Sequence, residues 1–216
     1  MDLDLTELSP AQVYFLMIQT VVPRPVAWVL SDSGEGRHNL APFSYFNGIC
    51  SSPPLCMISV GHKKDGSKKD TWRNIEERDD FVLHIGSPEH AGAISATSAG
   101  LVHGDSEVDL ARLETVPFEG SRLPRVVGPR VAYACRRHRI LELGDGPQGV
   151  IFGELRAVWI DDAIVDAGAE RLKIDPMKLD PISRLGGDDY GRLGEVFTVS
   201  RPGAQGPGNP AGGLVR

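Results

Sequence analysis

The stretch "HNLAPFSYFNGICSSPPLCMISVG", residues 38–61, carries the most information about the fold of this chain. It opens with a strand-like run at 39–42 and closes at 55–61 with an apolar run typical of a second strand. Between them lie aromatic residues, a Ser pair, a double proline and small polar residues such as Ser44 and Asn47. Small polar side chains beside accessible backbone either bind a ligand or make turns. The stretch by itself leaves both interpretations open.

Outward from this stretch, further strands are predicted by β-rich runs between turn signals. Residues 26–31, "VAWVLS", precede it, and the turn "DSGEG" separates the two. The other predicted strands are residues 37–44, 55–61, 81–85, 131–140, 149–160 and 195–200. Alternation in the longest of them places Ile151, Leu155, Ala157 and Trp159 on one face. Six or seven closely spaced strands favour an antiparallel barrel over a doubly wound sheet.

A few short helices complete the predicted fold. Ser9 and Gln12 fit a capping box, and the prolines in residues 21–25 end the helix that it starts. A second helix is predicted at residues 71–79, with Asp70 or Thr71 as its cap. Two further helices are predicted at residues 88–100 and 105–114. The chain is therefore expected to be mainly β with short helices.

The length and composition predict one domain with a tail. A chain of 216 residues that is 41% hydrophobic suits a single globular domain, expected over residues 1–201. In residues 202–216, Gly and Pro supply eight of fifteen positions. Such a segment cannot bury a core, so a Gly/Pro-rich C-terminal tail is predicted there.

Charge and hydropathy narrow the class of partner and the compartment. The net charge of −6 argues against a nucleic-acid surface as the main function. The acidic N-terminus lacks the basic flank and apolar run of a signal peptide, and no segment approaches the length of a membrane span. We expect a cytoplasmic protein that binds neither nucleic acid nor membrane.

Cysteine, histidine and glycine spacings point to no familiar catalytic motif. Three cysteines without CxxC spacing predict free thiols, with a nucleophilic cysteine as the alternative. The six histidines show no HxH, HxxxH or HExxH spacing, so no metal site is predicted. The chain also lacks GxSxG, GxGxxG and GxxxxGK[ST]. A bound nucleotide would need neither a Rossmann turn nor a P-loop.

The loop "KKDGSKKDT", residues 63–71, is the strongest candidate for anion binding. It holds four lysines within seven residues and leads into a predicted helix start. Helix N-termini bind phosphate because their unsatisfied amides and the dipole both favour negative charge. Lys69 would add a charge and Thr71 a hydroxyl. A solvated hairpin tip with an ordinary cap is the alternative.

Taken together, these segments resemble the flavin reductase-like family, whose members have the FMN-binding split-barrel fold. The matching segments, in chain order, are "PRPVAWVLS" (23–31), "NLAPFSYFNGICSSPPL" (39–55), "KKDTWRNI" (68–75), "FVLHI" (81–85), "LDPISRLGGDDYGRL" (179–193) and "VSRP" (199–202). The resemblance covers about residues 10–202. It implies a six-stranded antiparallel Greek-key barrel, dimeric, with FMN near the subunit interface.

The resemblance also implies a set of cofactor contacts. The strand at 39–44 would lie along the flavin, where its small residues let backbone amides approach the ring. The residues assigned to this wall are Asn39, Ala41, Pro42, Phe43, Ser44, Ser59, Val60 and Gly61. Lys69, Asp70 and Thr71 would meet the phosphate. Arg24 is a second candidate for the anionic end, and Arg184 is a weaker one, from the same or the partner chain.

The function implied is an NAD(P)H-dependent flavin reductase that delivers reduced FMN to a monooxygenase or another acceptor. The cofactor carries the hydride chemistry, so no catalytic residue is assigned. Two alternatives remain: a flavoredoxin-like FMN electron carrier reduced by a protein, and a non-redox split barrel that binds another anionic ligand. His84 departs from the family pattern, which usually has asparagine there, and Leu30-Ser31 replaces a frequent Ser-Thr.

Overall fold

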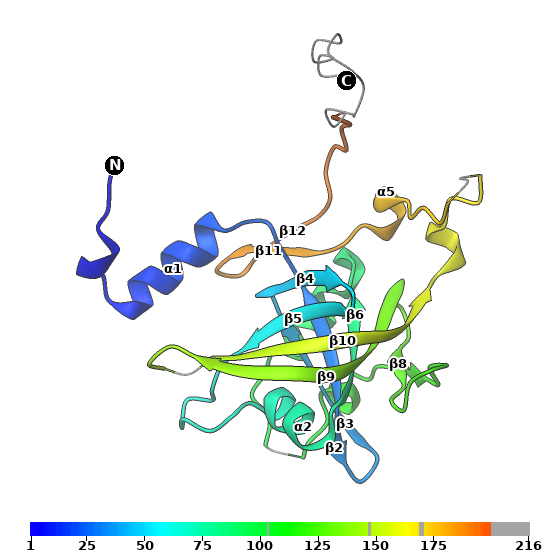
Figure 1. The fold of residues 1–216 in the computed structure, drawn as a ribbon, viewed down its shortest axis with the longest axis horizontal. Helices are drawn as coiled ribbons and strands as arrows, with labels where there is room; N and C mark the ends of the chain where they lie inside the picture. Colours follow the sequence, from blue (N-terminus) through cyan, green and yellow to red (C-terminus); the bar gives the residue numbers. More distant parts are fainter. Residues whose placement is uncertain (103, 147, 169–170, 200–216) are drawn as a thin grey trace.

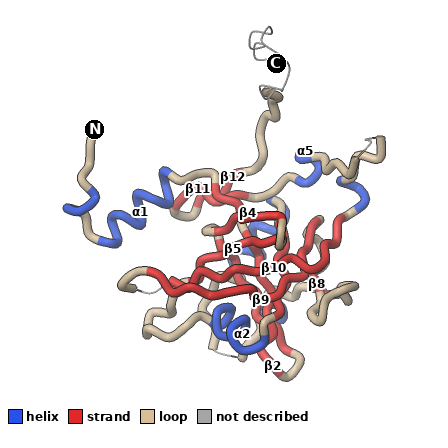
Figure 2. Tube along the Cα trace, viewed as in Figure 1, coloured by secondary structure: helices blue, strands red, loops and turns tan. Residues whose placement is uncertain are grey.

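The computed structural model describes residues 1–102, 104–146, 148–168 and 171–199. A large curved sheet forms the centre of the molecule, and the helices lie around its edges (Figures 1 and 2). The predicted tail at 202–216 lies outside the described residues.

The main sheet has seven strands, all paired antiparallel, in the order β3-β2-β6-β9-β10-β5-β4. Its strands are β2 (Ala27–Gly34), β3 (Arg37–Phe43), β4 (Phe46–Ser51), β5 (Pro54–Val60), β6 (Asp80–Ile85), β9 (Val131–Leu143) and β10 (Gln148–Ile160). The expected mainly β, antiparallel fold is confirmed. The resemblance implied six strands, whereas the main sheet has seven, and its edge strand β4 lies where no strand was predicted.

Two small sheets accompany the main one. The strands β1 (Arg24–Pro25), β11 (Ser183–Gly186) and β12 (Asp189–Gly191) form the first, and β7 (Thr115–Val116) and β8 (Arg125–Val126) form the second. The final strand predicted at 195–200 is wrong for its described part, because residues 195–199 form no strand and hold only an isolated β-bridge at Thr198. The C-terminal pairing is made earlier in the chain, by β11 and β12.

The helical elements are η1 (Leu5–Glu7), α1 (Pro10–Thr20), α2 (Asp70–Arg78), η2 (Pro88–His90), α3 (Ala91–Ala96), α4 (Glu107–Leu110), η3 (Asp162–Ile164) and α5 (Pro176–Leu179). The capping box that starts α1 is confirmed. The N-cap of α2 is Lys69, one residue before the predicted cap. The helix predicted at 88–100 ends at Ala96, where the Thr97 hydroxyl bonds the Ile94 carbonyl. The helix predicted at 105–114 shrinks to the four residues of α4.

The core has two layers that share strand β2. Trp28 and Leu30 pack into the layer covered by α3, and Ala27 and Val29 pack into the layer with α2. Because successive side chains of a strand point to opposite faces, a strand buried on both faces reads as a continuous apolar run. This explains why the segment "VAWVL" shows no alternation. The second layer fills the barrel, and Trp72 and Ile75 of α2 close one end of it.

His84 of β6 is fully buried, and its ring connects strands β2 and β8. Its Nδ1 lies 3.0 Å from the Trp28 carbonyl, and its Nε2 accepts a hydrogen bond from the Val126 amide at 3.0 Å. This pairing requires the neutral ring with its proton on Nδ1. Burial lowers the pKa of His84 to about 4, so the neutral form is retained near pH 7.

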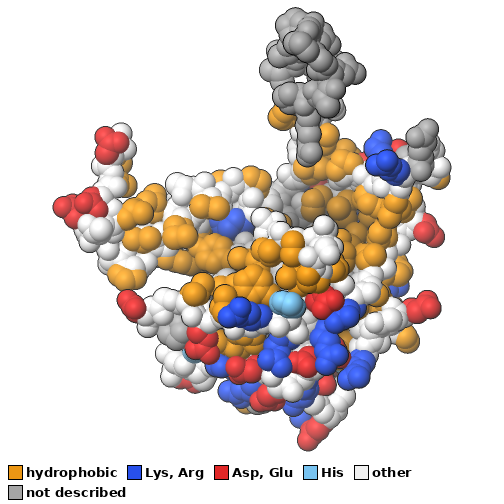
Figure 3. Space-filling view, viewed as in Figure 1, with side chains coloured by type: hydrophobic (Ala, Val, Ile, Leu, Met, Phe, Trp, Pro, Cys, Tyr) orange, Lys and Arg blue, Asp and Glu red, His pale blue; other side chains and the backbone are white. Residues whose placement is uncertain are grey.

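Helix α1 extends from the body beside the β11–β12 hairpin (Figure 1). Of its residues only Ile18 is buried, whereas Tyr14, Phe15 and Met17 are about half exposed. Hydrophobic side chains cover α1 and continue onto the adjoining body, and charged side chains gather on the lower half of the same face (Figure 3). None of the described helices is long and apolar enough to cross a membrane.

Candidate functional site

A cavity of about 720 Å³ opens between strand β3, the loop after β5, the start of α2 and the segment after α3. Its volume lies within the range of about 300–1,000 Å³ that is usual for small-molecule sites. Seven of the thirteen cofactor-binding residues predicted from sequence line it: Asn39, Ala41, Pro42, Phe43, Lys69, Asp70 and Thr71. The structure therefore brings the "NLAPF" strand and the "KDT" segment, far apart in sequence, to one cavity.

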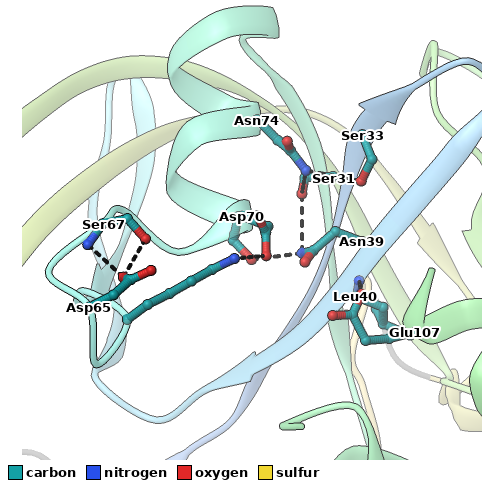
Figure 4. Close-up of polar contacts among 11 residues, drawn as sticks. Ser31, Ser33, Asn39, Leu40, Asp65, Ser67, Asp70, Asn74 and Glu107 are labelled. Carbon is teal, nitrogen blue, oxygen red and sulfur yellow. Dashed lines mark hydrogen bonds and ion pairs between the residues drawn. The ribbon is translucent and has the colours of Figure 1, made fainter. Parts of the chain in front are cut away.

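A buried hydrogen-bond network fixes the start of α2 against the sheet. Asn39 Nδ2 donates to Thr71 Oγ1 at 2.8 Å and to Ser31 Oγ at 3.3 Å. Asn74 Nδ2, one turn further along α2, donates to Ser31 Oγ at 3.1 Å and to Ser33 Oγ at 3.3 Å. Figure 4 shows Asn39, Ser31 and Asn74 in line between the strands and the helix. Because Thr71 Oγ1 accepts from Asn39, its own proton can be donated to a ligand.

The first turn of α2 forms the cationic end of the cavity. Its N-cap, Lys69, makes no side-chain capping bond, so no side chain of the cap satisfies the first amides of this nine-residue helix. Lys63, Lys64 and Lys69 all line the cavity. Lys63 Nζ also forms an ion pair with Asp70 at 2.7 Å, which holds the loop to the helix start.

The fourth lysine of the loop has a structural role. Lys68 Nζ lies 2.7 Å from Glu76 Oε1 and 4.7 Å from the centre of the Trp72 ring, and it does not line the cavity. The sequence could not separate these lysines, because all four stand within one turn-rich loop.

The opposite wall was missed by the sequence analysis. It comprises Thr97–Leu101 and Glu107. Trp28 Nε1 donates to Thr97 Oγ1 at 2.9 Å, and the Leu40 amide donates to Glu107 Oε2 at 3.0 Å, so both ends of this wall are tied to the sheet. Burial raises the pKa of Glu107, and the bond from Leu40 partly offsets that effect. The small polar run "TSAG" at 97–100 was the available signal.

A smaller cavity of about 220 Å³ adjoins the first, and Pro42 and Ser98 line both. Two more predicted residues, Ser44 and Arg184, line this smaller cavity. Arg24 lines neither cavity, but its Nε donates to Ser44 Oγ at 3.4 Å. The structure thus places Arg24 and Arg184 in one group and the lysines in another.

Ser59, Val60 and Gly61 line neither of the two cavities. Val60 is fully buried in the barrel, and the Ser59 amide bonds the Tyr45 carbonyl at 2.9 Å. Gly61 lies beside the side chain of Gln148. Their cofactor contacts stay predictions.

The remaining reactive side chains form no second site of an expected kind. Within the part of the chain that the structure describes, no group of three His, Cys, Asp or Glu residues is arranged to hold a metal. All three cysteines are free thiols, with Cys56 and Cys135 buried and Cys50 exposed. Burial raises the pKa of Cys135, which keeps that thiol protonated and unreactive.

Comparison with known families gives one match that covers most of the chain. Residues 19–171 match the model described as the flavin reductase-like domain. Among curated proteins, an uncharacterized protein of Halalkalibacterium halodurans is 38% identical over 207 residues, 94% of this chain and 97% of its own length.

Solved structures show the same architecture. Nitrilotriacetate monooxygenase component B from Bacillus cereus is 34% identical with a TM-score of 0.85, covering 92% of this chain and 98% of that one. The 2-nitrobenzoate 2-nitroreductase of Pseudomonas fluorescens is 28% identical with a TM-score of 0.84, covering 97% and 100%. A split-barrel protein of Shewanella frigidimarina, 17% identical, aligns with a TM-score of 0.79 over 93% of this chain and 99% of its own. With the sheet described above, this likeness confirms the split-barrel fold.

Proposed function

This chain belongs to the flavin reductase-like family, and we propose that it binds FMN and transfers hydride to it from NADH or NADPH. The observation that supports this proposal most directly is the larger cavity. It joins an uncapped helix N-terminus and three lysines at one end to the small residues of β3 along its side.

The lysine end fits a phosphate group. Amides at the start of α2, the Thr71 hydroxyl and the ammonium groups of Lys64 and Lys69 favour a doubly charged anion, whereas the charge of Lys63 is paired with Asp70. Asn39 fixes the rotamer of Thr71 through the 2.8 Å bond between them. We assign phosphate binding to Lys69 and Thr71, with Asn39 as a positioning residue.

The β3 side fits a flat ring. Ala41 presents little bulk to the cavity, and Pro42 offers it an apolar surface but no amide hydrogen, so the expected amide contact cannot come from Pro42. A ring can therefore approach the strand closely. When bound, FMN supplies a ring that accepts hydride from the nicotinamide. The residues of this chain bind and orient that ring, and the wall at 97–101 limits the access of water to it.

The names of two relatives support an oxidoreductase that passes electrons onward. The Bacillus cereus protein is a component of a monooxygenase, and the Pseudomonas fluorescens protein is a nitroreductase. We propose that reduced flavin from this protein serves a separate monooxygenase or reduces an organic acceptor in place.

The deciding experiment is the visible spectrum of FMN-loaded protein during anaerobic addition of NADH, repeated with NADPH. We expect the oxidised flavin band to bleach within seconds with one of the two nucleotides. A flavin that stays bound and oxidised with both would contradict the reductase and favour the carrier alternative. Failure of the protein to retain or reduce flavin at all would leave the non-redox ligand-binding alternative.

We also propose that the protein is a homodimer. Tyr14, Phe15 and Met17 of α1 and Val21 at its C-cap are exposed apolar residues. Figure 3 shows that the hydrophobic side chains of this helix continue onto the adjoining body. Contiguous apolar surface of this kind marks an interaction site in a protein that is otherwise charged. Light scattering should give twice the mass of 23.4 kDa, and Phe15→Glu should shift it toward the monomer. A monomer in the unsubstituted protein would overturn this proposal.

A further inference from the structure

We propose that the smaller cavity is a subsite for the pyrophosphate of a nicotinamide dinucleotide, with Arg184 as the binding residue and Arg24 as a positioning residue. This inference rests on the proposed function, because it concerns the second substrate of the same reaction. Neither arginine has a carboxylate partner within 4.0 Å in the part of the chain that the structure describes.

Arg24 is a buried cation. It is 5% exposed, and its Nη1 donates to the carbonyls of Ile18 and Val21 while Nε donates to Ser44 Oγ. Among the described residues, no Asp or Glu oxygen lies within 4.0 Å of its nitrogens. A buried charge is costly unless it is paired, so this arrangement favours an anion nearby.

Arg184 is the cross-strand partner of Arg24 in the β1–β11 pair. Its guanidinium lies 4.4 Å from the centre of the Tyr190 ring and donates to the Gly187 carbonyl. These contacts hold the planar group at the wall of the smaller cavity, where Ser44, Ser95 and Ser98 add hydroxyls. A fixed guanidinium with neighbouring hydroxyls is suited to a phosphate or pyrophosphate.

The two cationic groups line different cavities, which favours separate roles for them. Lysines gather in the larger cavity and arginines at the smaller one, and only Pro42 and Ser98 line both. FMN has one phosphate, which the lysine end accommodates. The arginine end is then left for the anionic group of a second ligand, and a nicotinamide dinucleotide is the anionic second substrate of the proposed reaction.

One carboxylate opposes this potential. Asp188 lines the smaller cavity and is exposed, and it forms no ion pair with Arg184 within 4.0 Å. Its charge weakens anion binding without cancelling the arginine. The Asp188→Asn variant should therefore strengthen nucleotide binding, whereas removal of the Arg184 charge should weaken it.

The test uses FMN-saturated full-length protein and steady-state oxidation of the preferred nucleotide. Arg184→Gln keeps an aliphatic stem over Tyr190 and removes the charge. We expect it to raise KM for the nucleotide about tenfold, because one charge-assisted bond is lost, with the FMN Kd unchanged.

Asp188→Asn should lower KM for the nucleotide about twofold. Pyrophosphate should inhibit competitively, and less so in Arg184→Gln. Arg139→Gln, an exposed arginine on β9, is the matched control and should change nothing.

Several outcomes would overturn the assignment. A weaker FMN affinity with unchanged nucleotide KM in Arg184→Gln would move this arginine to the flavin phosphate. Equal KM values in Arg184→Gln and Arg139→Gln would remove the subsite, provided that thermal melting shows both variants folded. If the unsubstituted protein does not bind FMN, the proposed function fails. Calorimetric titration with pyrophosphate then tests the subsite independently. Binding heat in the unsubstituted protein that is lost in Arg184→Gln would support the subsite. No binding heat in the unsubstituted protein, or equal heat in both, would overturn it.

Discussion

At the residue scale, Thr71 shows how one side chain connects fold and site. It is buried, it begins α2 beside the Lys69 cap, and its hydroxyl is held by Asn39 of β3. The same bond that docks the helix also orients a proton toward the cavity. Removal of the hydroxyl should therefore affect ligand binding as well as packing.

Lys69→Ala and Thr71→Ala should each weaken FMN binding, by about tenfold, because each removes one charge-assisted contact to the phosphate. Quenching of flavin fluorescence on titration measures the Kd. Lys68→Ala is the matched control, since Lys68 pairs with Glu76 and lies outside the cavity. Unchanged affinity in both Lys69→Ala and Thr71→Ala would refute the phosphate assignment.

His84 makes the stability dependent on pH. Burial holds its pKa at about 4, below the ordinary value of 6.5, so the unfolded chain binds this proton first as the pH falls. Its contribution is complete above pH 6.5 and is lost progressively between pH 6.5 and 4, on the order of 3 kcal/mol in total.

Urea unfolding at pH 7 and pH 4.5 tests this expectation. As the pH decreases from 7 to 4.5, the free energy of unfolding should decrease more in the unsubstituted protein than in His84→Gln, because the variant has no imidazole to protonate at this position. Equal decreases in both proteins would assign the acid sensitivity to other groups.

At the element scale, β10 shows what strand alternation misses. Ile151, Leu155, Ala157 and Trp159 were predicted on one face, but Ile151 and Leu155 pack inside the barrel while Ala157 and Trp159 pack against the outer layer. The register against β9 shifts between Leu155 and Ala157. A β-bulge there adds a residue and reverses the faces beyond it. The single-face prediction is wrong for this reason.

Gly153 of β10 lies under the Phe81 ring, and a Cβ there would stand 2.3 Å from the ring. Because Phe81 is buried and the ring cannot yield, Gly153→Ala should destabilise the fold by about 1–3 kcal/mol. Gly48→Ala on the edge strand β4 is the control, since nothing lies within 4 Å of its added carbon. Chemical denaturation of the two variants measures the difference, and similar midpoints would contradict the expected clash.

At the scale of the whole molecule, the site crosses elements that are distant in the chain. β3, the loop before α2, and the segment between α3 and α4 meet only in the folded barrel. A ligand that binds there stabilises the folded state by mass action. Ligand binding at this cavity is therefore coupled to global unfolding of the chain.

FMN at about a hundredfold its Kd should add about 2.7 kcal/mol to the free energy of unfolding. For a chain of this length that corresponds to a rise in Tm of roughly 5–10 °C. Scanning fluorimetry with FMN, and with riboflavin as the control that lacks phosphate, measures it. An equal shift with riboflavin would show that the lysine end contributes little.

Sequence patterns were sufficient to predict the class of fold, most strand positions, the α1 capping box and seven residues that line the larger cavity. Local chemistry accounts for the β-rich runs, the Ser–Gln cap and the helix start beside lysines, whereas the cavity residues of β3 followed from the family resemblance. These signals act over a few residues and are readable without the fold.

The folded structure was needed to show which of the four loop lysines line the larger cavity, that residues 97–101 form its far wall, and that Arg184 lines the other cavity. It also decided the strand β4 and the bulge in β10. These features depend on pairing between distant segments, because direction, register and burial are properties of the packed sheet and no local pattern encodes them.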